Sequence, residues 1–248
     1  MTGIRLALAG LLAALALSAT AAMAQDFETK AKFAVLMDYE SGTLLFHKDG
    51  DEPLEPASMA KLMTVAVVFD EIQQRRLSLD DEFFISEHAW RDGGAASGGS
   101  TMFAELNSKV KVSDLLRSVI IQSGNDAAIA LAEGLGGTEA QFASMMNKLA
   151  KEIGLTNSHF VNATGLPDPN QYSTARDLAT VARFLIAQFP EYYPMFSEPE
   201  FTWNKIRQQN RNSLVEMGIG VDGLKTGHTE AAGYGTVVST AAGGRRLI

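Results

Sequence analysis

The segment from Met59 to Ile72 most constrains how this chain can fold. Large apolar side chains recur along it at steps of three and four residues, a periodicity that predicts a helix. Pro56 precedes the segment, and Asp70 and Glu71 interrupt it, so these residues mark the approximate limits of the helix. The pattern predicts a largely buried helix whose core-facing residues are Met59, Leu62, Met63, Ala66, Phe69 and Ile72.

Ser58 and Lys61 lie at the start of this helix, three residues apart. That spacing brings a hydroxyl and an amine to the same face, in the positive field of the helix N-terminus. A serine becomes a good nucleophile when a base takes its proton, and a lysine can be that base if burial or a nearby positive charge destabilises its ammonium form. The pair is therefore a candidate nucleophile and base. The alternative is an N-capping serine followed by an unrelated lysine.

The Ser-x-x-Lys pattern is weak by itself, because composition alone produces it roughly once in a chain of this length. It occurs a second time, at Ser108 and Lys111, in a polar segment with no apolar helix behind it. This second pair is expected to be exposed and without a catalytic role. Other parts of the chain must decide whether Ser58 and Lys61 are catalytic.

Residues 1–24 have the pattern of a secretory signal peptide, with Arg5, an apolar run over residues 6–17 and a small-x-small cleavage site at residues 22–24. We therefore expect an exported protein. An uncleaved membrane anchor is the alternative, although the apolar run is short for a bilayer-spanning helix. The absence of cysteine is compatible with an oxidising compartment and rules out disulfides and thiolate zinc sites.

Residues 25–248 are long enough for one large domain with a sizeable core, and they show no repeat, heptad pattern or low-complexity linker. The net charge of the whole chain is −8, and residues 1–24 contribute only Arg5 to it, so the mature chain is more acidic still. A nucleic-acid partner would require a basic patch. We therefore predict a single domain that does not bind nucleic acid.

Local patterns predict the remaining elements. Two apolar runs separated by a turn predict a β-hairpin over residues 33–46. The glycine-rich residues 91–100 are expected to form a mobile surface loop, and residues 207–212 a polar turn. Short strands are expected at residues 77–80, 83–86, 201–203, 236–240 and 245–248. Helices are expected over residues 112–121 (with Ser113 as N-cap), 126–133, 138–153 and 174–187.

A tight polar break, Gln122-Ser123-Gly124-Asn125, separates two of these helices. If both helices are buried, the break places Ser123 and Asn125 at helix ends that face a common cavity. The alternative is a helix–loop–helix turn in which both side chains only cap the helices. Taken alone, the break fits capping better than catalysis.

Several common catalytic patterns are missing from the sequence. There is no Gly-x-Ser-x-Gly elbow, which disfavours an α/β-hydrolase, and no His-Glu-x-x-His zinc motif. The four histidines, His47, His88, His159 and His228, are scattered along the chain and are more typical of surface or core positions than of a metal site. No metal and no cofactor are predicted.

Three short motifs nevertheless follow one another along the chain: Ser58-x-x-Lys61, Ser123-Gly124-Asn125 and Lys225-Thr226-Gly227. Such a trio is typical of penicillin-binding proteins and class A β-lactamases. Over nearly all of residues 27–248 the chain resembles the low-molecular-mass D-alanyl-D-alanine carboxypeptidases of bacterial cell walls. The match is carried by residues 56–61, 122–127, 172–177, 206–212 and 221–234.

The resemblance implies an α/β (α+β) fold of the β-lactamase/transpeptidase type. An antiparallel sheet would be flanked by helices, with the active site between the sheet edge and a helical lobe. It also implies a serine peptidase that attacks the bond between the two terminal D-alanines of a peptidoglycan stem pentapeptide. The serine would form an acyl-enzyme, release one D-alanine and be freed by water, and β-lactams would inhibit the enzyme.

The resemblance also implies roles for individual residues. Ser58 would be the nucleophile and Lys61 its base, Ser123 would relay protons, and Asn125 would bind the substrate amide.

The last motif would form the sheet-edge side of the site. Lys225 and Thr226 would meet the terminal carboxylate of the substrate, and Lys225 would also lower the pKa of Lys61. Gly227 would leave room for substrate against the strand, and the His228 N–H would complete an oxyanion hole with the N–H of Ser58. Arg207 is a further candidate for the carboxylate, on its Ile-Arg-Gln context alone.

Members of this family usually continue with more sheet, a C-terminal helix and often a β-rich domain with an amphipathic membrane-binding tail. The resemblance therefore predicts that residues 25–248 are a catalytic domain that is incomplete at its C-terminus. Peripheral membrane association would depend on a segment absent from this sequence, and the protein would act at the periplasmic face of the inner membrane.

Three other functions on the same residues remain open. A D,D-endopeptidase would use the same site to cut cross-links. A class A β-lactamase would carry Ser-Asp-Asn and a Glu-x-x-Leu-Asn loop, whereas this chain has Ser-Gly-Asn and no such loop, so slow penicillin hydrolysis with a long-lived acyl-enzyme is expected. A non-catalytic peptidoglycan-binding protein would keep the pocket without the chemistry.

Overall fold

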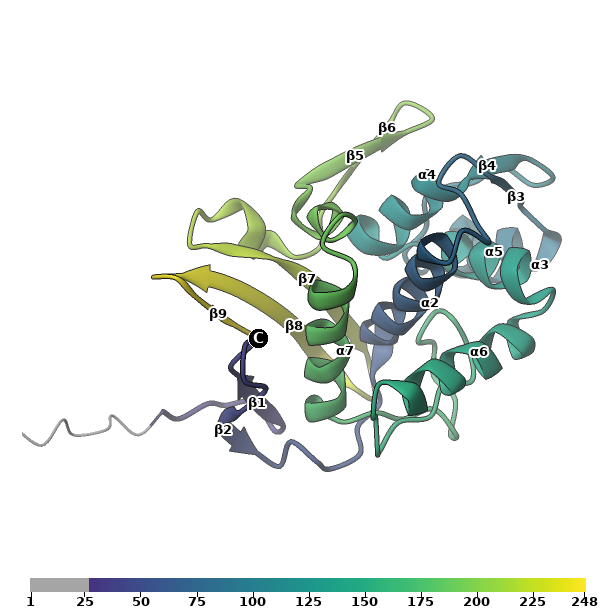
Figure 1. Cartoon of the computed structure of the whole chain (residues 1–248). Coiled ribbons are helices and arrows are strands. Elements are labelled where there is room, and N and C mark those ends of the chain that lie inside the picture. Colours follow the sequence, from purple (N-terminus) through teal and green to yellow (C-terminus); the bar gives the residue numbers. More distant parts are fainter. Residues whose placement is uncertain (1–26) are drawn as a thin grey trace, which may run out of the picture. The chain divides into compact units, whose positions relative to one another are not determined.

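The computed structural model describes residues 27–248, so the signal peptide predicted at residues 1–24 lies outside the described residues. The chain divides into two units, with the boundary between Ala31 and Lys32. In the described part of the first unit, the Ala31 N–H donates to Thr29 Oγ1 at 3.2 Å. The second unit carries the helices and strands labelled in Figure 1.

An antiparallel sheet forms one part of the second unit. The last three strands lie in the order β7-β8-β9, and β1 and β2 form the predicted hairpin. Met37 and Ile248 exchange two backbone hydrogen bonds, of 2.8 and 2.9 Å, so β1 continues the sheet beyond β9. The strands are β1 (Ala34–Met37), β2 (Leu44–Lys48), β7 (Val221–Thr229), β8 (Gly233–Ala242) and β9 (Arg245–Leu247).

Helices form the other part, and none within residues 27–248 is long and apolar enough to span a bilayer. The central one, α2, contacts α5, α6 and α7, while α7 also packs on β1 and β8. Figure 1 shows α2 with α7 on one side and α5 and α6 on the other. The helices are α2 (Lys61–Gln73), α3 (Glu87–Asp92), α4 (Val112–Arg117), α5 (Asn125–Gly136), α6 (Glu139–Glu152) and α7 (Ala175–Gln188).

The central helix is buried on every face rather than along one stripe. In addition to the predicted core residues, Val65, Val67 and Val68 are at most 3% exposed. A helix with apolar side chains on every face must be covered on every face, and α5, α6 and α7 cover α2. Any polar group at the start of α2 is therefore held in the core.

Side-chain caps start two of the surrounding helices where the sequence predicts. Thr138 accepts the Gln141 N–H at 3.2 Å, and Thr174 accepts the Asp177 N–H at 3.0 Å. Each cap satisfies a backbone donor that the first helical turn leaves unpaired, which typically stabilises a helix by about 1 kcal/mol. The starts of α6 and α7 are thus set locally.

Two predictions around α4 are wrong. Ser113 does not cap the helix, because its N–H donates to the Leu79 carbonyl at 3.0 Å and a distant backbone group replaces the side-chain cap. Residues 77–80 do not form a strand. The Asp81 carboxylate accepts the Ser78 N–H at 2.8 Å and closes a turn instead.

The polar turn predicted at residues 207–212 lies elsewhere. β5 (Glu200–Trp203) and β6 (Ile206–Gln209) form a hairpin, and its two-residue turn is Asn204-Lys205, both with positive φ (44° and 67°). Tight hairpin turns with positive φ at both positions match the twist of the flanking strands. The turn therefore falls ahead of the polar run, and the first half of the run, residues 207–209, is strand.

The glycine-rich residues 91–100, predicted to form a mobile surface loop, are exposed over most of their length but pack against the protein at Gly93 and Ser100. The Gly93 carbonyl accepts the Asp126 N–H at 3.1 Å, and the Ser100 carbonyl accepts the Asn125 N–H at 2.8 Å. A side chain at Gly93 would lie 2.4 Å from the Asp126 nitrogen. The glycines allow this segment to lie directly on the start of α5.

Candidate active site

The predicted nucleophile and base lie side by side at the start of the central helix. Ser58 is in the single turn η1 (Ala57–Ala60), and Lys61 is the first residue of α2. Ser58 is half-buried, whereas the whole of Lys61 is 0% exposed. Ser58 Oγ and Lys61 Nζ are 3.1 Å apart, as their three-residue spacing predicts.

Two further oxygens surround the Lys61 amine. Its Nζ donates to Asn125 Oδ1 at 2.7 Å and to the Thr164 carbonyl oxygen at 2.5 Å. Both oxygens can only accept hydrogen bonds. A neutral amine has two N–H groups and one lone pair, so these acceptors take both N–H groups and leave the lone pair for the Ser58 hydroxyl. The arrangement orients Lys61 as a proton acceptor.

The surroundings of Lys61 also favour its neutral form. Burial lowers the pKa of Lys61 well below its ordinary value of 10.5, and the positive charge of Lys225 lowers it further. The carboxylates of Asp126 and Glu139 act in the opposite direction. Burial and a nearby like charge can each make a lysine act as a base, and both are present here.

Lys225 comes from β7, which packs against η1. It is only 2% exposed, and its Nζ donates to the Thr226 carbonyl at 2.9 Å. Burial, followed by the charge of Arg211, lowers the pKa of Lys225 to about 7. The terminal strand of the sheet therefore brings a buried amine and the half-buried Thr226 to the side of the site opposite the helices.

The charge of Arg211, and not that of the predicted Arg207, acts on Lys225. The Arg211 N–H donates to the Ile121 carbonyl at 2.9 Å, which holds it beside the turn before Ser123. Arg207 is exposed and its guanidinium pairs with Glu200 across the β5–β6 hairpin. The sequence alone does not show which of the two arginines acts at the site, because both lie in one polar stretch.

The room predicted for substrate at Gly227 is occupied by the protein itself. A Cβ at Gly227 would lie 3.1 Å from the Met59 nitrogen, so the missing side chain allows β7 to approach η1. This contact brings the His228 end of β7 alongside the turn that carries Ser58. The His228 ring is exposed and stacks on Tyr234, with centroids 4.1 Å apart.

Ser123 lies where the α4 helix finally ends. The helix continues as a π-helical turn, Ser118–Gln122, and Ser123 then adopts a left-handed φ of 68°. Both features concentrate at functional sites. The Ser123 Oγ is buried and has no hydrogen-bond partner among residues 27–248. Capping does not explain this hydroxyl, since α5 begins without a side-chain cap.

Asp126 holds the neighbouring Asn125 in place, a role that the sequence does not reveal. Its carboxylate is fully buried and accepts hydrogen bonds from Thr101 Oγ1 (2.6 Å) and from the N–H groups of Met102 (3.0 Å) and Ala104 (3.1 Å). A buried carboxylate is stable when such donors surround it. Asp126 thereby ties a distant loop to the start of α5.

The Thr164 carbonyl comes from a loop in which the sequence shows no motif. Gly165 follows it with a φ of +79°, and a Cβ there would lie 1.9 Å from the Ala57 carbonyl oxygen. Only glycine combines this backbone conformation with so close an approach. Thr164 could not be found from the sequence because its contribution is a backbone atom.

A cavity of about 570 Å³ lies between the β5–β6 hairpin and the turn before Ser123, and none of Ser58, Lys61, Ser123, Asn125 or Lys225 is among its lining residues. Gln122, which precedes Ser123, forms part of its wall, as does Arg211. The remaining lining residues are Phe103, Ile206, Arg207, Gln208, Gln209 and Asn210.

The fold and the three motifs define the class of protein. The family model for D-alanyl-D-alanine carboxypeptidases (peptidase S11) matches residues 18–248. The chain therefore belongs to this family, and both the predicted family and the predicted mixed α/β fold are confirmed.

Comparison with individual proteins gives the same result. The chain is 46% identical over 216 residues to the D-alanyl-D-alanine carboxypeptidase DacC of Escherichia coli, which covers 86% of this chain and 54% of that protein. It thus spans about half the length of this relative. The crystal structure of penicillin binding protein 5 from Haemophilus influenzae matches with a TM-score of 0.86 and 44% identity, over 90% of this chain and 65% of that one.

A third similar protein has a ligand. The penicillin-binding protein D2 of Listeria monocytogenes, solved in its ampicillin-bound form, matches with a TM-score of 0.76 and 30% identity. The match covers 90% of this chain and 89% of that one.

The packing of Gly165 against η1 predicts an unequal effect of two alanine substitutions. Gly154→Ala introduces a side chain at a φ of +83° with no atom within 4 Å, which should destabilise the protein by about 1–2 kcal/mol. Gly165→Ala adds the collision with Ala57, so a further loss of about 1–3 kcal/mol is expected. Urea denaturation of both variants measures the difference, and equal losses would show that the loop does not press on η1.

Proposed function

We propose that this chain is the catalytic part of a serine D-alanyl-D-alanine carboxypeptidase. It would remove the terminal D-alanine from peptidoglycan stem pentapeptides and be inhibited by β-lactams. The observation that carries the proposal is the buried Lys61 amine, 3.1 Å from Ser58 Oγ and with its two N–H directions taken by Asn125 and Thr164. The names of the carboxypeptidase relatives support the same reaction.

In the first step, neutral Lys61 takes the Ser58 proton while Oγ attacks the carbonyl carbon between the two D-alanines. The carbonyl oxygen becomes an oxyanion, for which the N–H groups of Ser58 and His228 are the proposed donors; each is worth about 3 kcal/mol. The proton then passes to the leaving nitrogen, with Ser123 as the proposed relay. The C–N bond breaks, D-alanine departs, and an ester remains on Ser58.

In the second step, a water molecule attacks the ester carbon and gives a proton to the site, which restores the Ser58 hydroxyl and releases the shortened peptide. A β-lactam would undergo the same attack, but its leaving nitrogen stays attached through the opened ring. We propose that this acyl-enzyme persists. The ampicillin-bound form of the Listeria protein supports β-lactam binding by the fold.

The sheet side of the site is proposed to bind the free carboxylate at the end of the substrate. Lys225 and Arg211 supply positive charge, and Thr226 a hydroxyl, at the end of the sheet next to η1. An anion bound there would favour the protonated form of Lys225, whose pKa of about 7 leaves it partly neutral in the empty site. An enzyme that needs a free carboxylate in this position would cleave only the last peptide bond of a chain.

We expect the mature protein to release D-alanine from a stem pentapeptide and to be labelled covalently by fluorescent penicillin. Ser58→Ala should abolish both reactions. Lys61→Ala should slow labelling by roughly 100- to 10,000-fold, because the proton acceptor is lost. Lys111→Ala is the matched control: Lys111 is the exposed lysine of the second Ser-x-x-Lys pattern and pairs with Asp80 at 2.9 Å, so labelling should be unchanged.

Equal effects of the two lysine substitutions would show that the wrong pair had been assigned. A wild-type protein that binds the stem pentapeptide but neither cleaves it nor takes the label would be a non-catalytic binder. Release of a cross-linked partner peptide, without loss of a terminal alanine, would identify an endopeptidase. Mass spectrometry of the peptides distinguishes these results.

The carboxylate proposal is tested with a stem pentapeptide whose C-terminus is either free or amidated. Arg211→Gln should raise KM for the free acid roughly tenfold or more, since a charge-assisted contact is lost, and leave the amidated peptide unaffected. Arg207→Gln removes the neighbouring arginine, already paired with Glu200, and should change KM less than twofold. The reverse pattern would assign the carboxylate to Arg207.

We also propose that the protein is exported and acts at the periplasmic face of the inner membrane. The signal-like pattern of residues 1–24 supports this, as does a proposed substrate that lies outside the cytoplasm. N-terminal sequencing of the protein from a periplasmic fraction should find Gln25 as the first residue. A cytoplasmic protein that retains residues 1–24 would contradict export.

A further inference from the structure

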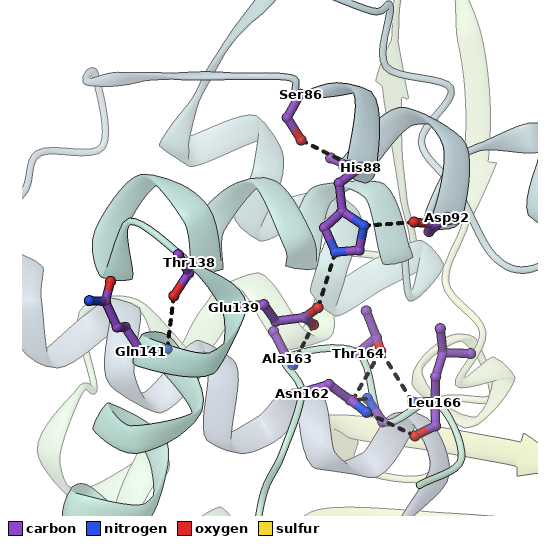
Figure 2. A network of polar contacts seen from close by, with 12 residues as sticks. Ser86, His88, Asp92, Thr138, Glu139, Gln141, Asn162, Ala163, Thr164 and Leu166 are labelled. Carbon is purple, nitrogen blue, oxygen red and sulfur yellow. Dashed lines mark hydrogen bonds and ion pairs between the residues drawn. The ribbon is translucent and has the colours of Figure 1, made fainter.

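A chain of polar contacts leads from the surface to the catalytic lysine through Glu139, the first residue of α6. Glu139 Oε1 accepts the Ala163 N–H at 3.0 Å, and the next residue, Thr164, gives its carbonyl to Lys61. On the outer side, Glu139 Oε2 lies 3.3 Å from His88 Nε2. Figure 2 shows Glu139 between the His88 ring and Ala163.

Ala163, the residue before Thr164, is held from two sides. The Ala163 carbonyl accepts the Thr64 hydroxyl of α2 at 2.7 Å, while its N–H is held by Glu139. Within the loop, Asn162 Oδ1 accepts the Gly165 N–H at 2.8 Å and the Thr164 hydroxyl at 3.1 Å. The Glu139 bond ties Ala163 to α6, in addition to the two bonds of 2.6 and 2.9 Å that Asn147 of the same helix makes with Phe160.

His88 in turn orients the Glu139 carboxylate. Its other ring nitrogen, Nδ1, lies 2.7 Å from Asp92 Oδ2, and Glu133 is a further charge acting on the ring. Burial opposes the charged ring, but the bonds to Asp92 and Glu139 outweigh it and raise the pKa of His88 above 6.5. Below that raised pKa the imidazolium bridges two carboxylates of different helices, α3 and α6.

We propose that Glu139 is a positioning residue for Lys61: it fixes the Thr164 carbonyl against the lysine amine by holding the Ala163 N–H, and His88 keeps its carboxylate in that orientation. The inference rests on the proposed function, in which Lys61 is the base for Ser58. If the Thr164 carbonyl were to move, one N–H of the amine would lose its acceptor and the lone pair would no longer be directed to the Ser58 hydroxyl.

Glu139 also acts on Lys61 at a distance. Its negative charge favours the ammonium and raises the pKa of Lys61, against the larger effect of burial. The two actions can be separated by substitution, since Gln keeps an oxygen acceptor for the Ala163 N–H and removes the charge. Ala removes both.

The experiment measures the rate of acylation by fluorescent penicillin as a function of pH. With Glu139→Gln, the limb on which the rate rises with pH should move to lower pH, on the order of 0.5 unit, because the pKa of Lys61 falls when the negative charge is removed. The rate at the plateau should stay within about twofold of wild type. With Glu139→Ala, the plateau rate should fall roughly 10- to 100-fold, while KM for the stem pentapeptide changes little.

Glu152→Gln is the matched control, since Glu152 ends the same helix and lies beside the exposed Lys148; its profile should superimpose on that of wild type. An unchanged Glu139→Ala plateau would overturn the proposal, and so would a Glu139→Gln plateau that falls as far as that of Glu139→Ala, because Gln keeps an acceptor for the Ala163 N–H. If Glu139→Ala does not fold, Glu139→Leu, which also removes the acceptor but fills more of the space, decides through the same plateau rate. Failure of the proposed function is a separate result, because wild type itself would then take no label.

Discussion

The burial of one amine organises this protein. An ammonium group in the core is unfavourable by several kcal/mol unless charges or hydrogen bonds compensate, and Lys61 lies in the core because α2 is covered on every face. Burial lowers the pKa of the amine and favours loss of its proton, and oxygens from three other segments surround it: Ser58 in η1, Asn125 in α5 and Thr164 in a loop. Each of these segments must be held accurately for the amine to act as a base.

The two parts of the fold supply different components to the site. The helical part contributes the proposed nucleophile, its proposed base and the Ser123 hydroxyl, which has no hydrogen-bond partner among residues 27–248, whereas the sheet contributes positive charge from Lys225. They meet closely because small residues stand at the contacts. Gly227 lets β7 approach η1, and Gly165 lets the Thr164 loop approach it from another direction. Side chains at either position would separate groups that have to lie within hydrogen-bonding distance.

Elements defined by neighbouring residues could be predicted, and elements defined by distant ones could not. The starts of α6 and α7 follow from Thr138 and Thr174, which cap their own helices. Ser113 is also a serine at the start of a helix, yet it does not cap α4, because its backbone N–H donates to the Leu79 carbonyl instead. The polar β6 strand carries no apolar alternation, so only its pairing with β5 identifies it. Local chemistry decides a boundary only where no tertiary partner competes for the same backbone group.

The sequence by itself determined the central buried helix, the three motifs in their order and, through them, the family. Those features depend on side-chain identity at short spacing, which a linear pattern preserves. The tertiary structure alone decided that the Thr164 carbonyl completes the lysine site, that Arg211 rather than Arg207 lies near Lys225, and that Asp126 and Glu139 act on Lys61. Backbone acceptors and through-space charges depend on which segments the fold brings together, and no spacing along the chain records that.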